Sequence, residues 1–190
     1  MTLALISPPA VEPVTLADMK AHLRVSHNSE DALISSLVKA AREELEQATG
    51  LALIAQGWRL YLDCWPRTQT VLIHKAPVLS LTAVTIYDDA GAPSLPPLSG
   101  FVLDRFSRPA RIAIPDAIAA PGKKLNGIEI DFTAGFGATG VEVPDGLKRA
   151  IMLLAAHWYE FRGAETFDRE SAAWPPSFER FVSRYRRVGL

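Results

Sequence analysis

Residues 144–163, PDGLKRAIMLLAAHWYEFRG, constrain the fold more than any other stretch of the chain. Pro144 and Asp145 suit the start of a helix, and Gly163 suits its end, because glycine adopts the left-handed conformation there without penalty. At a rise of about 1.5 Å per residue the helix spans about 27 Å, with charged residues near both ends. We predict a buried core helix that does not cross a membrane. The apolar residues that recur at helical spacing are Leu147, Ile151, Leu154, Ala155, Trp158 and Phe161.

The overall composition excludes several classes of protein. Among 190 residues, 48% are hydrophobic and 22% are charged, which is typical of a soluble globular chain. The net charge of −1 provides no general basic field for binding nucleic acid. The single cysteine, Cys64, excludes an internal disulfide framework and fits a reducing compartment. The first residues lack the basic start and long apolar run of a signal peptide.

Two segments near the N-terminus are predicted to be helical. Residues 1–14 contain three prolines, and we expect them to form an extended arm. Thr15 and Asp18 have the spacing of a capping box at the start of a short helix. Ser29 can cap a longer second helix, which Gly50 ends. This second helix is the expected packing partner of the core helix.

The middle of the chain changes from a helical to a strand-like pattern. From Gln56 the apolar period falls from about 3.6 residues to 2, and the clearest alternation lies at 128–133. The pattern contains no strand–helix–strand crossover, which argues against a parallel α/β enzyme fold. We predict an α+β fold in which an antiparallel β unit, residues 56–140, is inserted between two parts of a helical body, residues 15–55 and 141–163.

Residues 164–190 are expected to form a C-terminal docking arm and helix. The motif Trp174-Pro175-Pro176 interrupts any helix, and Ser177 can then cap a final one. This helix carries the chain's only basic cluster. It fits either a solvated helix face or a docking element, because aromatic residues and arginine are enriched in interface hot spots. The predicted docking residues are Phe178, Phe181, Arg184, Tyr185, Arg186 and Arg187.

No group of residues has the pattern of an active site. Residues 135–140, GFGATG, match the dinucleotide motif G-x-G-x-x-G, but no helix opens within the motif to meet a pyrophosphate. A sharp backbone turn before the core helix explains these glycines better. The four histidines lack metal-ligand spacing, and Asp88-Asp89 precede Ala-Gly in a typical turn sequence. We therefore predict no catalytic residue, no cofactor and no metal.

Short motifs follow one another in a characteristic order along nearly the whole chain. They are VTL at 14–16 with Lys20, Leu23, Arg24 and Val25, EDALI at 30–34, AARE at 40–43 with Glu46, Thr49 and Gly50, APV at 76–78, Tyr87 and Asp88 with Gly91, FTAGFG at 132–137, Val143 and Pro144 with Leu147, Lys148, Ala150 and Ile151, Tyr159 and Glu160 with Arg162, and RYR at 184–186. In this ordered series the chain resembles the small head–tail connector (adaptor) proteins of tailed bacteriophages and related gene transfer agents.

The resemblance implies a structural protein of a virion or phage-like particle, made in the bacterial cytoplasm. Such subunits form a ring, commonly of twelve, between the portal and the next tail component, or stopper. The ring surrounds the channel for double-stranded DNA without sequence-specific binding, and it needs neither a cofactor nor a membrane. In the family the helical parts form the body of the ring, and the C-terminal region tends to reach the portal. The helical residues expected to support the core and assembly are Leu37, Leu45, Ile151, Leu154 and Trp158.

Two other classes of function stay open at the level of sequence. An enzyme could bind or hydrolyse a small molecule in a cleft between the β unit and the helices, where strongly perturbed titrating groups would mark the site. A monomeric binding module could use the β unit alone. The mass of the protein in solution would separate that module from a ring.

Overall fold

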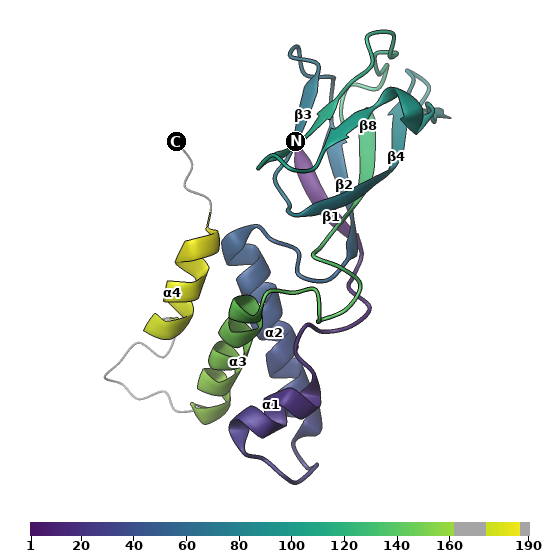
Figure 1. Ribbon diagram of the computed structural model, residues 1–190. Helices are drawn as coiled ribbons and strands as arrows, with labels where there is room; N and C mark the ends of the chain where they lie inside the picture. The colour runs from purple at the N-terminus through teal and green to yellow at the C-terminus, as the bar shows by residue number, and fades with distance from the viewer. Residues whose placement is uncertain (162–173, 187–190) are drawn as a thin grey trace, which may run out of the picture. The chain divides into compact units, whose positions relative to one another are not determined.

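The computed structural model describes residues 1–161 and 174–186, which form two compact units. Unit 1 contains Met1–Ala10 and Ile54–Phe136, and unit 2 contains Val11–Leu53 and Gly137–Leu190. All strands of the described residues belong to unit 1, and all their α-helices belong to unit 2 (Figure 1). The chain therefore has an α+β fold, with a helical body and an inserted antiparallel β unit.

Unit 1 contains two antiparallel sheets. The larger sheet has the order β1-β2-β8-β4-β5, formed by β1 (Thr2–Ser7), β2 (Gln56–Leu62), β8 (Ile128–Ala134), β4 (Val78–Tyr87) and β5 (Pro93–Ser94). The smaller sheet has the order β3-β7-β6, formed by β3 (Thr70–Ile73), β7 (Ala110–Ala113) and β6 (Val102–Asp104). A short 3-10 helix at Leu98–Gly100 follows β5.

Strand alternation builds the core of unit 1. In β8 the apolar residues Ile128, Ile130 and Phe132 are buried, while the polar residues between them lie on the other face of the sheet. On that polar face Arg59 Nε lies 2.6 Å from Asp131 Oδ1 and its Nη1 lies 2.8 Å from Glu129 Oε2. The polar face thus pairs its charges across the two central strands, β2 and β8.

The N-terminal residues differ from the expected arm. Thr2–Ser7 form β1, the edge strand of the larger sheet, with Thr2 opposite Tyr61 and Leu5 opposite Trp58 of β2. This pairing joins segments more than fifty residues apart, and such a contact leaves no local sequence signal. Val11–Leu53, which follow, belong to unit 2, where Val14 is buried.

Unit 2 is built from α1 (Leu16–Leu23), α2 (Asp31–Thr49), α3 (Asp145–Glu160) and α4 (Pro176–Tyr185). The Thr15 side chain accepts a hydrogen bond from the Asp18 N–H at 3.1 Å, as the capping-box pattern predicts. At the start of α2 the prediction is wrong, because Glu30 occupies the cap position and the Ser29 hydroxyl hydrogen-bonds to His27 Nδ1 instead. Gly50 ends α2 with φ of 71°, a conformation that favours glycine.

Helix α3 is the central helix of unit 2. It packs along α2 and also contacts α1 and α4 (Figure 1). Its fully buried residues are Leu147, Ala150, Ile151, Leu154 and Ala155. Phe161, predicted on the buried face, caps the helix and is 55% exposed, while the predicted stop Gly163 lies outside the described residues. Within the described ranges, no helix has both the length and the hydropathy to span a bilayer.

Candidate functional site

Helix α4 contacts both α2 and α3 through its aromatic side. Phe178 and Val182 are buried, and Phe178 meets the Trp174 ring edge-on at a centroid distance of 5.3 Å. Phe181 and Tyr185 lie over Gly146 of α3, where an added Cβ would come within 3.7 Å of the Phe181 ring. Phe178 therefore anchors α4 inside its own unit, and it offers no surface to a partner.

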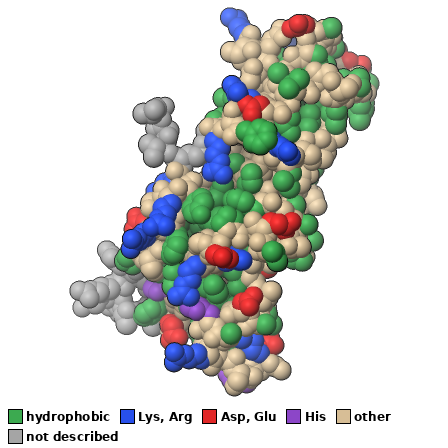
Figure 2. All heavy atoms as spheres, viewed as in Figure 1, with side chains coloured by type: hydrophobic (Ala, Val, Ile, Leu, Met, Phe, Trp, Pro, Cys, Tyr) green, Lys and Arg blue, Asp and Glu red, His purple; other side chains and the backbone are tan. Residues whose placement is uncertain are grey.

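The opposite side of α4 is exposed and basic. Arg180, Arg184 and Arg186 are exposed, and Lys and Arg side chains gather over α4 in Figure 2. Arg186 also lies over the Trp174 ring, with its Cζ 5.7 Å from the ring centroid. The Trp174 Nε1–H donates to Glu44 Oε1 of α2 at 2.9 Å, which fixes the start of the helix. The predicted docking residues up to Arg186 thus lie together on α4 and at its end. Their aromatic side chains face the other helices of unit 2, and their arginine side chains are exposed. Arg187 lies outside the described residues.

The five residues expected to support the helical core have two different environments. Leu45, Ile151 and Leu154 are fully buried. Leu37 and Trp158 are only half-buried and keep part of their surface exposed. The first three are core residues of unit 2, and the other two also contribute to its surface.

A buried ionic cluster, which the sequence did not reveal, joins α2 to the segment before α1. Arg42 is 4% exposed, and its guanidinium bonds to Glu46 Oε2 at 2.9 Å and Glu12 Oε2 at 2.7 Å. Glu46 Oε1 also accepts a hydrogen bond from the Leu53 N–H at 2.7 Å, so the same carboxylate holds the backbone that follows α2. Burial disfavours the charged guanidinium, but the hydrogen bond that it donates to Glu12 and the nearby carboxylates together raise the pKa of Arg42. The only local sequence signal for this cluster is the i, i+4 spacing of Arg42 and Glu46.

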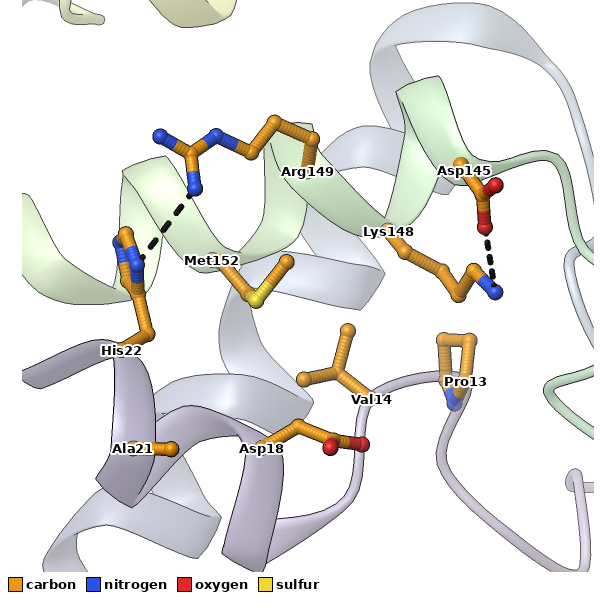
Figure 3. A pocket seen from close by; sticks show the side chains of 9 residues that line it. All are labelled: Pro13, Val14, Asp18, Ala21, His22, Asp145, Lys148, Arg149 and Met152. Atoms are coloured by element: carbon orange, nitrogen blue, oxygen red, sulfur yellow. Dashed lines mark hydrogen bonds and ion pairs between the residues drawn. The ribbon is translucent and has the colours of Figure 1, made fainter.

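A groove between α1 and α3 was also missed, because its walls come from two segments that are far apart in the sequence, 13–22 and 145–152 (Figure 3). It has a volume of about 590 Å³, and Met152 and Val14 contribute apolar surface. Lys148 pairs with Asp145 at 2.7 Å, and Arg149 lies beside His22. Burial, and to a lesser extent the charge of Arg149, lower the pKa of His22. The walls of this groove contain no nucleophilic Ser, Thr or Cys side chain.

Two residues with possible catalytic roles, Cys64 and His157, belong to different units. Cys64 is exposed. The His157 ring is tilted by 50° against the Phe161 ring at a centroid distance of 4.8 Å, and its buried Nε2 has no hydrogen-bond partner among the described residues. Residues 1–161 and 174–186 hold no group of three or more His, Cys, Asp or Glu side chains arranged to bind a metal.

The glycine-rich loop at 135–140 is a structural turn. Helix α3 begins only at Asp145, so no helix N-terminus lies within the loop. Gly135 has φ of +150°, and a Cβ there would lie 2.5 Å from the backbone nitrogen of Ala55. A Cβ at Gly140 would lie 2.6 Å from the carbonyl oxygen of Pro13. Close backbone contacts therefore account for these glycines.

Comparison with known proteins identifies the family. The sequence model described as phage gp6-like head–tail connector protein matches residues 13–77. A chain in the virion of a native gene transfer agent (GTA) particle is 32% identical, with a TM-score of 0.82 over 100% of this chain and 97% of that chain. A chain in the neck of an empty GTA particle, computed with C6 symmetry, is 32% identical with a TM-score of 0.83 and the same coverage.

A further chain, in the neck of a native GTA particle computed with C12 symmetry, is 31% identical, with a TM-score of 0.80 over 100% of this chain and 97% of that one. No curated protein sequence matches. The similarity runs through both units and all the described elements. This chain belongs to the phage gp6-like head–tail connector family.

Proposed function

We propose that this protein forms a ring at the neck of a phage-like particle, between the portal and the next tail component, or stopper. The observation that carries the proposal is the match over 100% of this chain to a chain in a GTA neck with C12 symmetry. Twelve copies around one axis would enclose a channel for double-stranded DNA. The net charge of −1 suits that role, because few phosphate contacts would hold the passing DNA.

We further propose that α4 is the element that docks on the portal. Its aromatic side is anchored on α2 and α3, so the arginine side is held in a fixed orientation. Arginine binds carboxylates through two parallel hydrogen bonds and is enriched in interface hot spots. Arg180 and Arg184 are exposed on the helix and no acidic partner within the described residues neutralises either of them. An acidic surface on the portal is the expected counterpart.

The double variant Arg180→Ala/Arg184→Ala tests this docking site. We expect its Kd for the portal to rise by about tenfold or more, because hot-spot truncation costs on the order of 1–2 kcal/mol. Binding by the parent chain should also weaken with added salt. The matched control is Arg67→Ala, an exposed arginine in unit 1, which should leave the Kd unchanged. Equal binding by the double variant and the control would exclude α4 as the docking element.

A further inference from the structure

The loop between β6 and β7 exposes an aromatic ring next to two arginines. Phe106 is 87% exposed, and the Cζ of Arg105 lies 5.4 Å from the centroid of its ring. Arg105 and Arg108, which lie on both sides of Phe106 in the sequence, are exposed. Neither arginine has an acidic partner within the described residues. Aromatic residues and arginine are enriched in protein interfaces, so the loop has the composition of a binding surface.

Asp104 holds the backbone of this loop in one conformation. Its carboxylate accepts hydrogen bonds from the Phe106 N–H at 3.1 Å and from the Ser107 N–H at 3.2 Å. The Ser107 hydroxyl donates to the same carboxylate at 2.6 Å, and Arg111 of β7 donates to it through Nε at 3.0 Å and Nη2 at 2.6 Å. Because the loop is already ordered, it loses little conformational entropy when it binds a partner.

Unit 2 contains an apolar pocket that can receive such a ring. The pocket lies between residues 11–16 and α2 and has a volume of about 330 Å³. A water molecule takes about 30 Å³ in the liquid, so this volume equals that of about ten waters and exceeds what a phenyl ring needs. Val14 and Val38 line the pocket and are buried, whereas Val11, which also lines it, is 47% exposed. An aromatic ring in the pocket would cover this apolar surface.

The charges beside the pocket are opposite to those on the loop. Glu12 lines the pocket and pairs with Arg42 of α2. Arg42 also pairs with Glu43 and Glu46, so three carboxylates surround one cation. Residues 104–111 contain the reverse combination, three arginines and one carboxylate. The side chains of Glu12 and Glu43 are 30% and 57% exposed, so the excess negative charge is open to a basic partner.

The loop belongs to unit 1 and the pocket to unit 2, so every copy of the chain carries both surfaces. A contact between two different surfaces of identical subunits is head-to-tail, which is the type of contact that closes into rings. We propose that Phe106 of one copy occupies the pocket between residues 11–16 and α2 of the next copy. The arginines beside Phe106 then face the carboxylates of Glu12 and Glu43. The proposal rests on the proposed ring, and it assigns one contact through which neighbouring subunits meet.

Photocross-linking in the full-length chain tests this contact. The photoreactive residue p-benzoylphenylalanine replaces Phe106, which keeps an aromatic ring in the loop, and the protein is irradiated alone and mixed with portal. We expect covalent multimers on denaturing gels, and mass spectrometry should place the cross-link in residues 11–16 or 35–38 of a neighbouring copy. The matched control carries the same group in place of Leu125, which is 70% exposed in unit 1, and should give no cross-link to those segments.

Charge reversal in the same assay tests the role of the arginines. Adding Arg105→Glu/Arg108→Glu to the photoreactive chain should lower the yield of covalent multimers by about tenfold or more, because the loop then repels the carboxylates beside the pocket. Arg67→Glu reverses an exposed charge elsewhere in unit 1 and should leave the yield unchanged. Equal yields from the two charge-reversed proteins would overturn the proposed contact.

Light scattering on the same samples separates the possible failures. A ring without cross-links to residues 11–16 or 35–38 would overturn the loop contact and leave the proposed ring intact. Cross-links that stay within one chain, or that join Phe106 only to portal, would also overturn this contact. A monomeric mass, alone and with portal, would overturn both the loop contact and the proposed ring.

Discussion

Arg42 holds together a buried ionic cluster in unit 2. Its guanidinium is buried between Glu46 and Glu12, and the Arg42→Met variant leaves those carboxylates without their cation. Removing one partner of a buried ion pair costs about 3–5 kcal/mol. We expect the free energy of unfolding to fall by that amount in urea titrations followed by helical circular dichroism. Lys39→Met, on the exposed side of the same helix, should change it by about 0.5 kcal/mol or less. Similar values for the two variants would contradict the account.

Asp104 provides a pH-dependent test at a single residue. Hydrogen bonds from the Ser107 hydroxyl and from Arg111 hold the pKa of its carboxyl well below the ordinary value of 3.8. Because the folded-state pKa is lowered, the stabilisation is present above the ordinary pKa and is lost as the pH falls through the folded value. NMR titration should find the carboxyl still ionised below its ordinary pKa. Ser107→Ala should raise the midpoint, and an unchanged midpoint would disprove the role of this hydrogen bond.

At the scale of elements, α4 is expected to stay docked through Phe178. This side chain is fully buried, and truncating a buried phenylalanine costs about 3–5 kcal/mol. Phe178→Ala should therefore release α4 and expose the chain near Trp174 to limited proteolysis. The control Phe106→Ala removes a ring that is 87% exposed in unit 1 and should leave the cleavage pattern unchanged. Equal protease resistance in both variants would show that α4 does not depend on this anchor.

The elements that the sequence predicted correctly are those with local signals. The capping contact at Thr15, the end of α2 at Gly50 and the alternation in β8 each depend on neighbouring residues. The features that it missed depend on partners distant in sequence, such as the pairing of β1 with β2. Phe178 shows the same limit: an amphipathic pattern predicts that a face is covered, but not by which partner. The sequence therefore predicted that the Phe178 side chain docks on a partner, whereas in the fold this side chain holds α4 in place.

On the scale of the whole molecule, the proposed docking surface lies on one of the two units. Unit 2 presents the exposed arginines of α4, while all strands of the described residues lie in unit 1. We expect Arg180→Ala/Arg184→Ala to keep the solution mass that the parent chain has without portal, because these side chains are exposed and are not part of the core of unit 2. A changed mass without portal, together with lost portal binding, would contradict this assignment.

Multi-angle light scattering of the purified protein, alone and mixed with portal, shows whether the chain assembles as a connector. A single chain has a mass of 20.7 kDa. We predict a ring-sized multiple of this mass, or a stable complex with the portal that contains many copies. A strict 20.7 kDa monomer that ignores the portal would contradict it.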